Sequence, residues 1–130
     1  MSDKKILCIG GEGFIGKHLK SICDRSDTDL FVADKILQDR HFVDVRDYKT
    51  FTNLPPCDVI VNLAAEHSDD VNPISEYYRV NLDGAKNVCR FAEERGVTKI
   101  IFTSSVAIYG MTREGEELNE ESSANPFNDY

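Results

Sequence analysis

The sequence of 130 residues contains no apolar run long enough to cross a lipid bilayer. Its first residues are polar and charged and lead directly into a short apolar segment, so they lack the anatomy of a signal peptide. These two absences predict a cytoplasmic protein with no membrane partner. Positive charge is also in deficit, since the formal net charge is −8, which argues against a nucleic-acid or membrane-surface partner.

Cysteine is sparse, and the spacing of its four residues matches no common metal or disulfide motif. Cys8, Cys23, Cys57 and Cys89 form no Cys-x-x-Cys pair. We therefore expect neither a structural metal nor a disulfide, and we interpret all four as buried, reduced thiols. No Gly-Lys-Ser/Thr sequence follows the glycine-rich segment near the N-terminus, which excludes a phosphate-transfer P-loop.

Short apolar segments that alternate with helical patterns make up most of the chain. Strands are predicted at residues 4–9, 30–33, 41–45, 58–65 and 99–103. Helices are predicted at residues 14–23 and 73–95, with a brief one at 48–54. Gly96 is placed to end the second of these helices.

Strands that alternate with helices predict parallel βαβ units, and near-continuous apolar strands predict burial on both faces. We therefore predict an α/β fold, a Rossmann-type doubly wound parallel sheet of about five strands in the order 3-2-1-4-5. Its fifth strand is an unpaired apolar edge, so we expect a homodimer through residues 99–103. Residues 1–110 are expected to form the cofactor-binding core, and the acidic, aperiodic residues 111–130 a poorly packed loop.

The segment "IGGEGFIGKHL" places Gly10, Gly13 and Gly16 between a predicted strand and a predicted helix. In that context the spacing is typical of a dinucleotide-binding turn. One glycine makes the tight turn, another lets the backbone approach a diphosphate, and the third lets the helix pack closely on the sheet. The helix start, with Phe14 and Ile15, then receives the phosphate charge. The alternative is an ordinary glycine-rich strand–helix turn.

Acidic residues end the second and third predicted strands. Asp34 lies eighteen positions after Gly16, where a carboxylate accepts both ribose hydroxyls of an adenosine and repels a 2′-phosphate, which favours NAD over NADP. Lys35 follows directly and weakens that preference. Asp44 and Val45 lie beside the expected adenine pocket, where the carboxylate can accept the adenine amino group. The alternatives are a cap or surface carboxylate for Asp34 and a turn-forming residue for Asp44.

Several longer segments match the motifs of one enzyme family. They are "GGEGFIG" at 10–16, "DVRD" at 44–47, "DVIVNLAA" at 58–65, "YYRVNLDGAKNV" at 77–88 and "GVTKIIFTSSVAIYG" at 96–110. With them the chain resembles the extended short-chain dehydrogenase/reductase family, in particular epimerases similar to UDP-galactose 4-epimerase. The family's members act mostly on nucleotide sugars. The last two segments are the most specific, and the last one carries Thr-Ser-Ser followed closely by Tyr-Gly.

This resemblance implies roles for individual residues. The small residues Leu63, Ala64 and Ala65 line the cofactor near its ribose, Asn81 is a structural and cofactor-proximal asparagine, and Thr103 ends the strand beside the cofactor. Ser105 aligns with the catalytic serine. Tyr130, which lies 25 residues after Ser105, matches the catalytic tyrosine, whereas Tyr109 belongs to the Tyr-Gly turn.

The lysine of the family's Tyr-x-x-x-Lys motif, the later strands and the substrate lobe have no counterpart in this sequence. We therefore expect a truncated chain that is inactive alone. The intact protein is expected to be an NAD-dependent nucleotide-sugar epimerase or dehydratase, and Thr-Ser-Ser favours 4-epimerisation of a UDP-sugar. The alternatives are a nucleotide-sugar reductase, a non-catalytic NAD-sensing or partner-binding protein, and a dehydrogenase of another Rossmann family. His67 is either a residue facing the nicotinamide or substrate, or a surface histidine.

Overall fold

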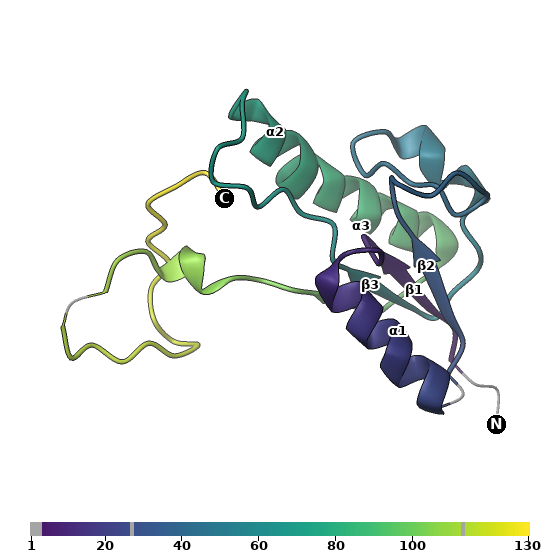
Figure 1. The fold of residues 1–130 in the computed structure, drawn as a ribbon, viewed down its shortest axis with the longest axis horizontal. Helices are drawn as coiled ribbons and strands as arrows, with labels where there is room; N and C mark the ends of the chain where they lie inside the picture. Colours follow the sequence, from purple (N-terminus) through teal and green to yellow (C-terminus); the bar gives the residue numbers. More distant parts are fainter. Residues whose placement is uncertain (1–3, 27, 113) are drawn as a thin grey trace.

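A computed structural model describes residues 4–26, 28–112 and 114–130, and its core is a parallel sheet flanked by helices (Figure 1). The strands are β1 (Ile6–Ile9), β2 (Leu30–Ala33), β3 (Val59–Asn62) and β4 (Ile100–Phe102). The α-helices are α1 (Phe14–Ser26), α2 (Ser75–Tyr77) and α3 (Gly84–Arg95), with a π-helical turn, Tyr78–Asp83, joining α2 to α3. Two 3-10 helices cover Tyr48–Asn53 and Val106–Tyr109.

The four strands lie in the order β2-β1-β3-β4, and every neighbouring pair is parallel. This confirms the predicted α/β class and the predicted relative order of these strands. The order reverses direction at β1, because β2 lies on one side of it and β3 on the other. That reversal opens a crevice at the carboxyl ends of the strands.

The predicted strand at residues 41–45 was wrong as a fifth strand. It forms only one isolated parallel bridge, between Asp34 and Phe42, beside the end of β2. The reason is that the chain turns directly after β2, where the Asp34 carboxylate accepts a hydrogen bond from Ile36 N–H. Residues 41–45 therefore run past the end of β2 with no strand left to pair with. The sheet has four strands rather than five within the described residues.

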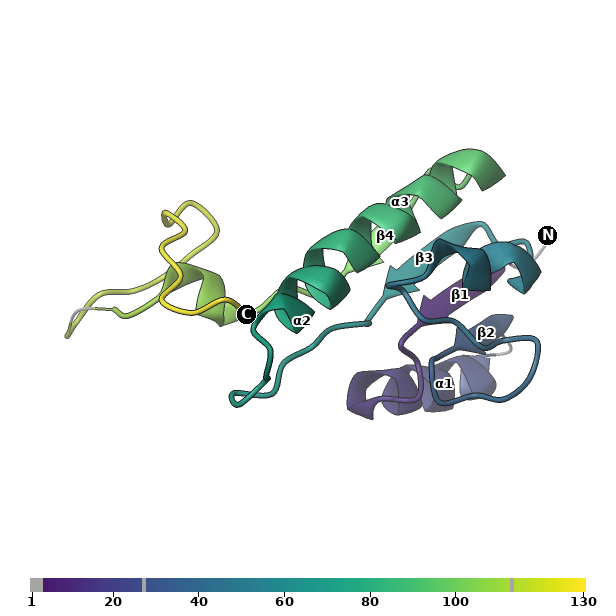
Figure 2. The same ribbon diagram turned by 90° about the horizontal axis from the view of Figure 1, so that it is seen from above.

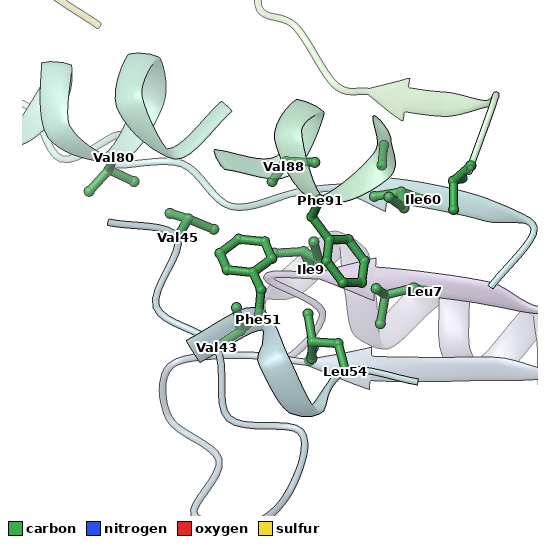
Figure 3. Close-up of a cluster of buried hydrophobic side chains, with 13 residues drawn as sticks. Leu7, Ile9, Val43, Val45, Phe51, Leu54, Ile60, Val80, Val88 and Phe91 are labelled. Atoms are coloured by element: carbon green, nitrogen blue, oxygen red, sulfur yellow. The ribbon is translucent and has the colours of Figure 1, made fainter. Parts of the chain in front are cut away.

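Helices cover both faces of the sheet (Figure 2). Helix α1 lies on one face, and α2 and α3 lie on the other. In the core between α3 and the sheet, Phe51 and Phe91 pack with ring centroids 5.6 Å apart, in one cluster with Leu7 and Ile60 (Figure 3). Alternate residues of β1 point to this face, so the strand is buried on both sides as predicted. Gly96 ends α3 in the left-handed conformation (φ 69°), also as predicted.

The edge strand β4 is much less covered than the strands beside it. Ile100, Ile101 and Phe102 are 38%, 44% and 59% exposed, whereas every residue of β3 is buried. Two of the four cysteines also differ from expectation. Cys8 and Cys23 are buried as predicted, but Cys57 is half-buried and Cys89 is exposed, because Cys89 lies on the solvent side of α3.

The described residues after Gly110 form no helix or strand and are nearly all exposed. In both views this segment extends away from the sheet and returns toward α2 (Figures 1 and 2). Asn125 N–H donates to the Ile108 carbonyl at 2.8 Å, and the Tyr78 hydroxyl donates to Asp129 Oδ1 at 2.5 Å. These two contacts hold the C-terminal part of the segment near the rest of the chain.

Candidate functional site

A cavity of about 410 Å³ opens at the carboxyl ends of β1, β2 and β3, beside the start of α1. Most of the predicted cofactor-binding residues line it, and all but Asp44 and Val45 lie just after a strand or near the start of α1. They are Gly10, Gly13, Phe14, Ile15, Gly16, Asp34, Lys35, Asp44, Val45, Leu63, Ala64 and Ala65. Tertiary structure thus brings together four separate segments of the chain at the crevice expected for a doubly wound sheet.

Each glycine of the turn meets a different spatial demand. Gly10 has a left-handed φ of 78°, and a Cβ there would lie 2.6 Å from the Ala64 nitrogen. A Cβ on Gly16 would lie 2.1 Å from the Gly11 carbonyl oxygen, so only glycine lets α1 pack this closely. Gly13 is different, because a Cβ there would meet only the Gly10 oxygen, at 3.4 Å. Packing within the protein therefore does not require glycine at position 13. The missing side chain leaves open space on the cavity side.

The start of α1 suits an anion. The first N–H groups of an α-helix have no partner within the helix, and the helix dipole places partial positive charge there. The described first turn of α1 contains no acidic side chain. Because Phe14, Ile15 and Gly16 line the cavity, this helix end faces the same space as Gly13.

The glycine turn fixes the Asp34 carboxylate from one side. Asp34 Oδ2 accepts a hydrogen bond from Glu12 N–H at 3.0 Å, and Oδ1 accepts from Ile36 N–H at 3.2 Å. A carboxylate has about four lone-pair positions, so these two bonds orient it and leave acceptor capacity for hydroxyl groups. Lys35, the next residue, is exposed and lines the same cavity.

At the other side of the cavity, Asp44 is engaged by a residue that sequence analysis did not identify. Arg46 Nη2 lies 2.6 Å from Asp44 Oδ2, and Arg46 Nε donates to Asp44 Oδ1 at 2.9 Å. The hydrogen bond from this guanidinium lowers the pKa of the Asp44 carboxyl, against the opposing effect of burial. Val45, which separates these two residues in the sequence, is buried, and its carbonyl accepts a hydrogen bond from Asn87 Nδ2 at 2.8 Å.

Asn81 holds the segment after β3 without lining the cavity itself. Its Oδ1 accepts from Glu66 N–H at 2.8 Å, and its Nδ2 donates to the Glu66 carbonyl at 3.0 Å. This pair of bonds mimics strand pairing and fixes residues 63–65 just before it. Asn81 lies in the π-helical turn, a helix distortion that often occurs at functional sites.

The predicted catalytic residues and Thr103 lie outside the cavity lining. Thr103 and Ser105 follow β4, and Ser105 Oγ accepts a hydrogen bond from Ala107 N–H at 3.1 Å, which caps the 3-10 helix Val106–Tyr109. Tyr130 is 38% exposed, and its neighbour Asp129 is bonded to Tyr78. The structure therefore does not test the pairing of Ser105 with Tyr130, which stays a prediction.

Some cavity residues had no assigned role in the sequence analysis. Besides Arg46, they are Ile9, Val43 and Val80, and His67 was left open between function and surface. The apolar members carry no signal beyond strand or helix patterning. His67 is exposed and does line the cavity, next to residues 63–65.

The residues that the structure describes contain neither a membrane-spanning helix nor a metal site. No helix described here is long and apolar enough to cross a membrane. Within the same residues, no group of three or more His, Cys, Asp or Glu side chains is arranged to hold a metal ion.

Comparison with known proteins agrees with this geometry. A model of the NAD dependent epimerase/dehydratase family matches residues 6–130. This chain belongs to that family. The assignment confirms the resemblance seen in the sequence motifs.

Similar proteins include epimerases of known structure. The chain is 40% identical over 133 residues to N-acetyl-alpha-D-glucosaminyl-diphospho-ditrans,octacis-undecaprenol 4-epimerase of Escherichia coli O157:H7, covering 96% of this chain and 39% of that protein. It is 25% identical to a Streptococcus mutans UDP-glucose 4-epimerase, over 96% of this chain and 42% of that protein. The crystal structure of Thermus thermophilus UDP-glucose 4-epimerase in complex with NAD superposes with a TM-score of 0.85, at 28% identity over 97% of this chain and 46% of that one. The chain thus spans less than half the length of these relatives.

Proposed function

We propose that this chain binds NAD in the 410 Å³ cavity, as the cofactor-binding part of a sugar epimerase. The observation that carries the proposal is the space kept open at Gly13, between the start of α1 and the fixed Asp34 carboxylate. Ordinary packing gives no reason for glycine at that position. A diphosphate approaching the backbone does give one. In the same proposal, residues 1–110 form the cofactor-binding core and residues 111–130 the loop that carries the catalytic tyrosine.

The lining residues fit the parts of a dinucleotide. The N–H groups at the start of α1 would bind the diphosphate, and Asp34 would accept the hydroxyls of the adenosine ribose. A carboxylate there repels a 2′-phosphate, so we propose NAD rather than NADP. The positive charge of Lys35, which also lines the cavity, would weaken this preference. Asp44 would accept the adenine amino group. Residues 63–65, held by Asn81, would lie along the nicotinamide half, and Thr103 would border it.

Ser105 and Tyr130 are the proposed catalytic residues. When bound, NAD accepts hydride from a sugar carbon and returns it. Ser105 Oγ already accepts a hydrogen bond from Ala107 N–H, so its own proton is available to stabilise charge on the sugar oxygen. Tyr130 would remove the proton from that oxygen. Proton removal requires the tyrosinate form of the side chain, which a neighbouring cation would stabilise.

Two kinds of sugar substrate are candidates. The sequence motifs favour 4-epimerisation of a UDP-sugar, and the Thermus thermophilus and Streptococcus mutans relatives are UDP-glucose 4-epimerases. The 40% identity to the undecaprenyl-diphospho-N-acetylglucosamine 4-epimerase favours a lipid-linked sugar diphosphate as the second candidate. That candidate would make the membrane surface a partner, contrary to the expectation from charge. We retain the UDP-sugar as the first proposal, with a cytoplasmic location.

Two measurements test this function. Isothermal titration with NAD, NADP and ADP-ribose is expected to show NAD bound more tightly than NADP, and Gly13→Val is expected to abolish binding by filling the open space. An assay of the protein, including all sequence that its gene encodes, would then follow C4 inversion of UDP-sugars and of undecaprenyl-diphospho-N-acetylglucosamine. NAD binding without conversion of either sugar would favour the non-catalytic NAD-sensing alternative. No NAD binding by the wild-type protein would refute the proposal.

A further inference from the structure

Arg46 connects two carboxylates that come from distant parts of the chain. Its Nη2 and Nε atoms bind Asp44 at the cavity, and its Nη1 lies 2.9 Å from Glu76 Oε2 in α2. The Arg46 side chain is 30% exposed, and both carboxylate side chains are 21% exposed. Paired charges shielded to this degree are held in one geometry more firmly than exposed pairs are.

The contacts around Asp44 leave room for one more donor. Oδ1 accepts from Arg46 N–H at 3.0 Å and from Nε at 2.9 Å, which accounts for both of its lone pairs. Oδ2 accepts from Nη2 at 2.6 Å and shares Nε at a longer 3.2 Å. One acceptor position on Oδ2 is therefore only weakly used, and the fork of Arg46 fixes which one it is.

Each nitrogen of the Arg46 guanidinium directs one N–H group to a carboxylate. Nε and Nη2 are directed to Asp44, and Nη1 is directed to Glu76. Arg46 and Asp44 both line the cavity, and these contacts fix the weakly used acceptor position of Asp44 Oδ2 at this side of the site. A base that carries an exocyclic amino group matches that arrangement, whereas a base with a carbonyl oxygen at the same position faces a carboxylate.

We propose that Arg46 is a positioning residue that sets the base preference of the site, selecting a 6-amino purine over a 6-oxo purine by fixing Asp44. The inference rests on the proposed NAD function, because it takes the adenine half of the dinucleotide to lie at Asp44. Glu76 supports the selection from α2 by holding Nη1. A partly buried acceptor that faces an unmatched carbonyl loses binding, which is how such a site discriminates.

The test compares NAD with nicotinamide hypoxanthine dinucleotide, which differs only in having a 6-oxo base. The wild-type chain is expected to prefer NAD by about tenfold or more, the ratio that one lost hydrogen bond in a shielded site produces. Arg46→Gln is expected to reduce this preference to within about threefold, because the Asp44 carboxylate is then free to rotate. Arg46→Lys keeps the charge without the fork, so an intermediate ratio is expected. Glu76→Gln, which leaves the Asp44–Arg46 pair intact, is expected to weaken the preference less.

The matched control is Arg79→Gln. Arg79 also binds Glu76, through Oε1, but its side chain is 57% exposed and does not line the cavity. This variant is expected to keep the wild-type ratio. An unchanged ratio in folded Arg46→Gln and Arg46→Lys, or equal binding of both dinucleotides by the wild-type chain, would overturn the inference alone. Binding of neither dinucleotide by the wild-type chain would overturn the proposed NAD function and this inference together.

Discussion

Gly10 and Ala64 lie in contact through their backbones, although they follow different strands. A Cβ on Gly10 would lie 2.6 Å from the Ala64 nitrogen and 2.8 Å from its Cα. The contact joins the glycine turn to the segment after β3, and both line the proposed NAD cavity. The close approach of these two segments, and with it the width of the cavity, therefore requires glycine at position 10.

Replacement of Gly10 tests this contact. Gly10→Ala is expected to lower the unfolding free energy by about 2–5 kcal/mol, from about 1–2 for the left-handed φ and about 1–3 for overpacking. NAD binding should be lost as well, because residues 63–65 are displaced. The control is Gly96→Ala, at a similar φ of 69° with no atom within 4 Å of the added Cβ. It should cost only about 1–2 kcal/mol and leave NAD affinity unchanged. Urea unfolding and calorimetry measure both, and equal losses in the two variants would contradict the argument.

Asn81 provides a second test, through Glu66. Asn81→Asp keeps the acceptor for Glu66 N–H but places an oxygen against the Glu66 carbonyl in place of the donor. We expect a loss of about 1–3 kcal/mol in unfolding free energy, together with weaker NAD binding. Asn119→Asp is the matched control, because Asn119 Oδ1 accepts from Glu121 N–H in an exposed turn and a carboxylate keeps that bond. If both variants behave like wild type, the two hydrogen bonds between Asn81 and the Glu66 backbone have no role in holding residues 63–65.

The raised pKa of the Cys8 thiol predicts that the folded chain loses stability at high pH. Burial raises its pKa from 9.0 to about 11, so the folded chain keeps the proton after the unfolded chain has released it. Between these two values the unfolding free energy should fall by about 1.4 kcal/mol per pH unit from this group. Cys8→Ala, although less stable overall, should show a shallower decline from pH 9 to pH 11. Parallel declines in urea-unfolding series would show that Cys8 does not titrate in this way.

The lowered pKa of the Asp44 carboxyl predicts that the folded chain loses stability in acid. The Arg46 guanidinium lowers the pKa of the Asp44 carboxyl below its usual 3.8. The folded state is therefore stabilised above the unfolded pKa, and this contribution is lost as the pH falls through the folded pKa. The stability difference between wild type and Asp44→Asn should thus be present at pH 6 and should shrink on titration to pH 2.5. A difference that stays constant over this range, measured by urea unfolding, would contradict the assignment.

The exposed edge strand predicts self-association. An unpaired apolar edge is a template for pairing with another copy, and Ile101 at the centre of β4 is 44% exposed. Sedimentation over a concentration series should show a dimer for the wild-type chain and a monomer for Ile101→Lys. Ile22→Lys changes an equally apolar residue on α1, 59% exposed, and should keep the dimer. A wild-type chain that is monomeric at every concentration would refute this proposal.

Local patterns were sufficient wherever a segment's structure depends on its own residues. The apolar strands, the helix that begins at Phe14 and the stop at Gly96 all followed from spacing and from backbone preference. The strand predicted at residues 41–45 failed because pairing needs a partner, and β2 ends at Ala33. Cys89 was misjudged for a related reason, since the face of α3 that meets the sheet is fixed by packing.

The amino-acid sequence by itself determined the family, the order of the four strands, and most residues of the cavity, because glycine spacing and strand ends are local properties. Only the tertiary structure decided that Arg46 joins Asp44 to Glu76 and that Asn81 holds the Glu66 backbone. These contacts bridge residues 30 and 15 positions apart. No local pattern records them, because long side chains meet only after the helices have packed on the sheet.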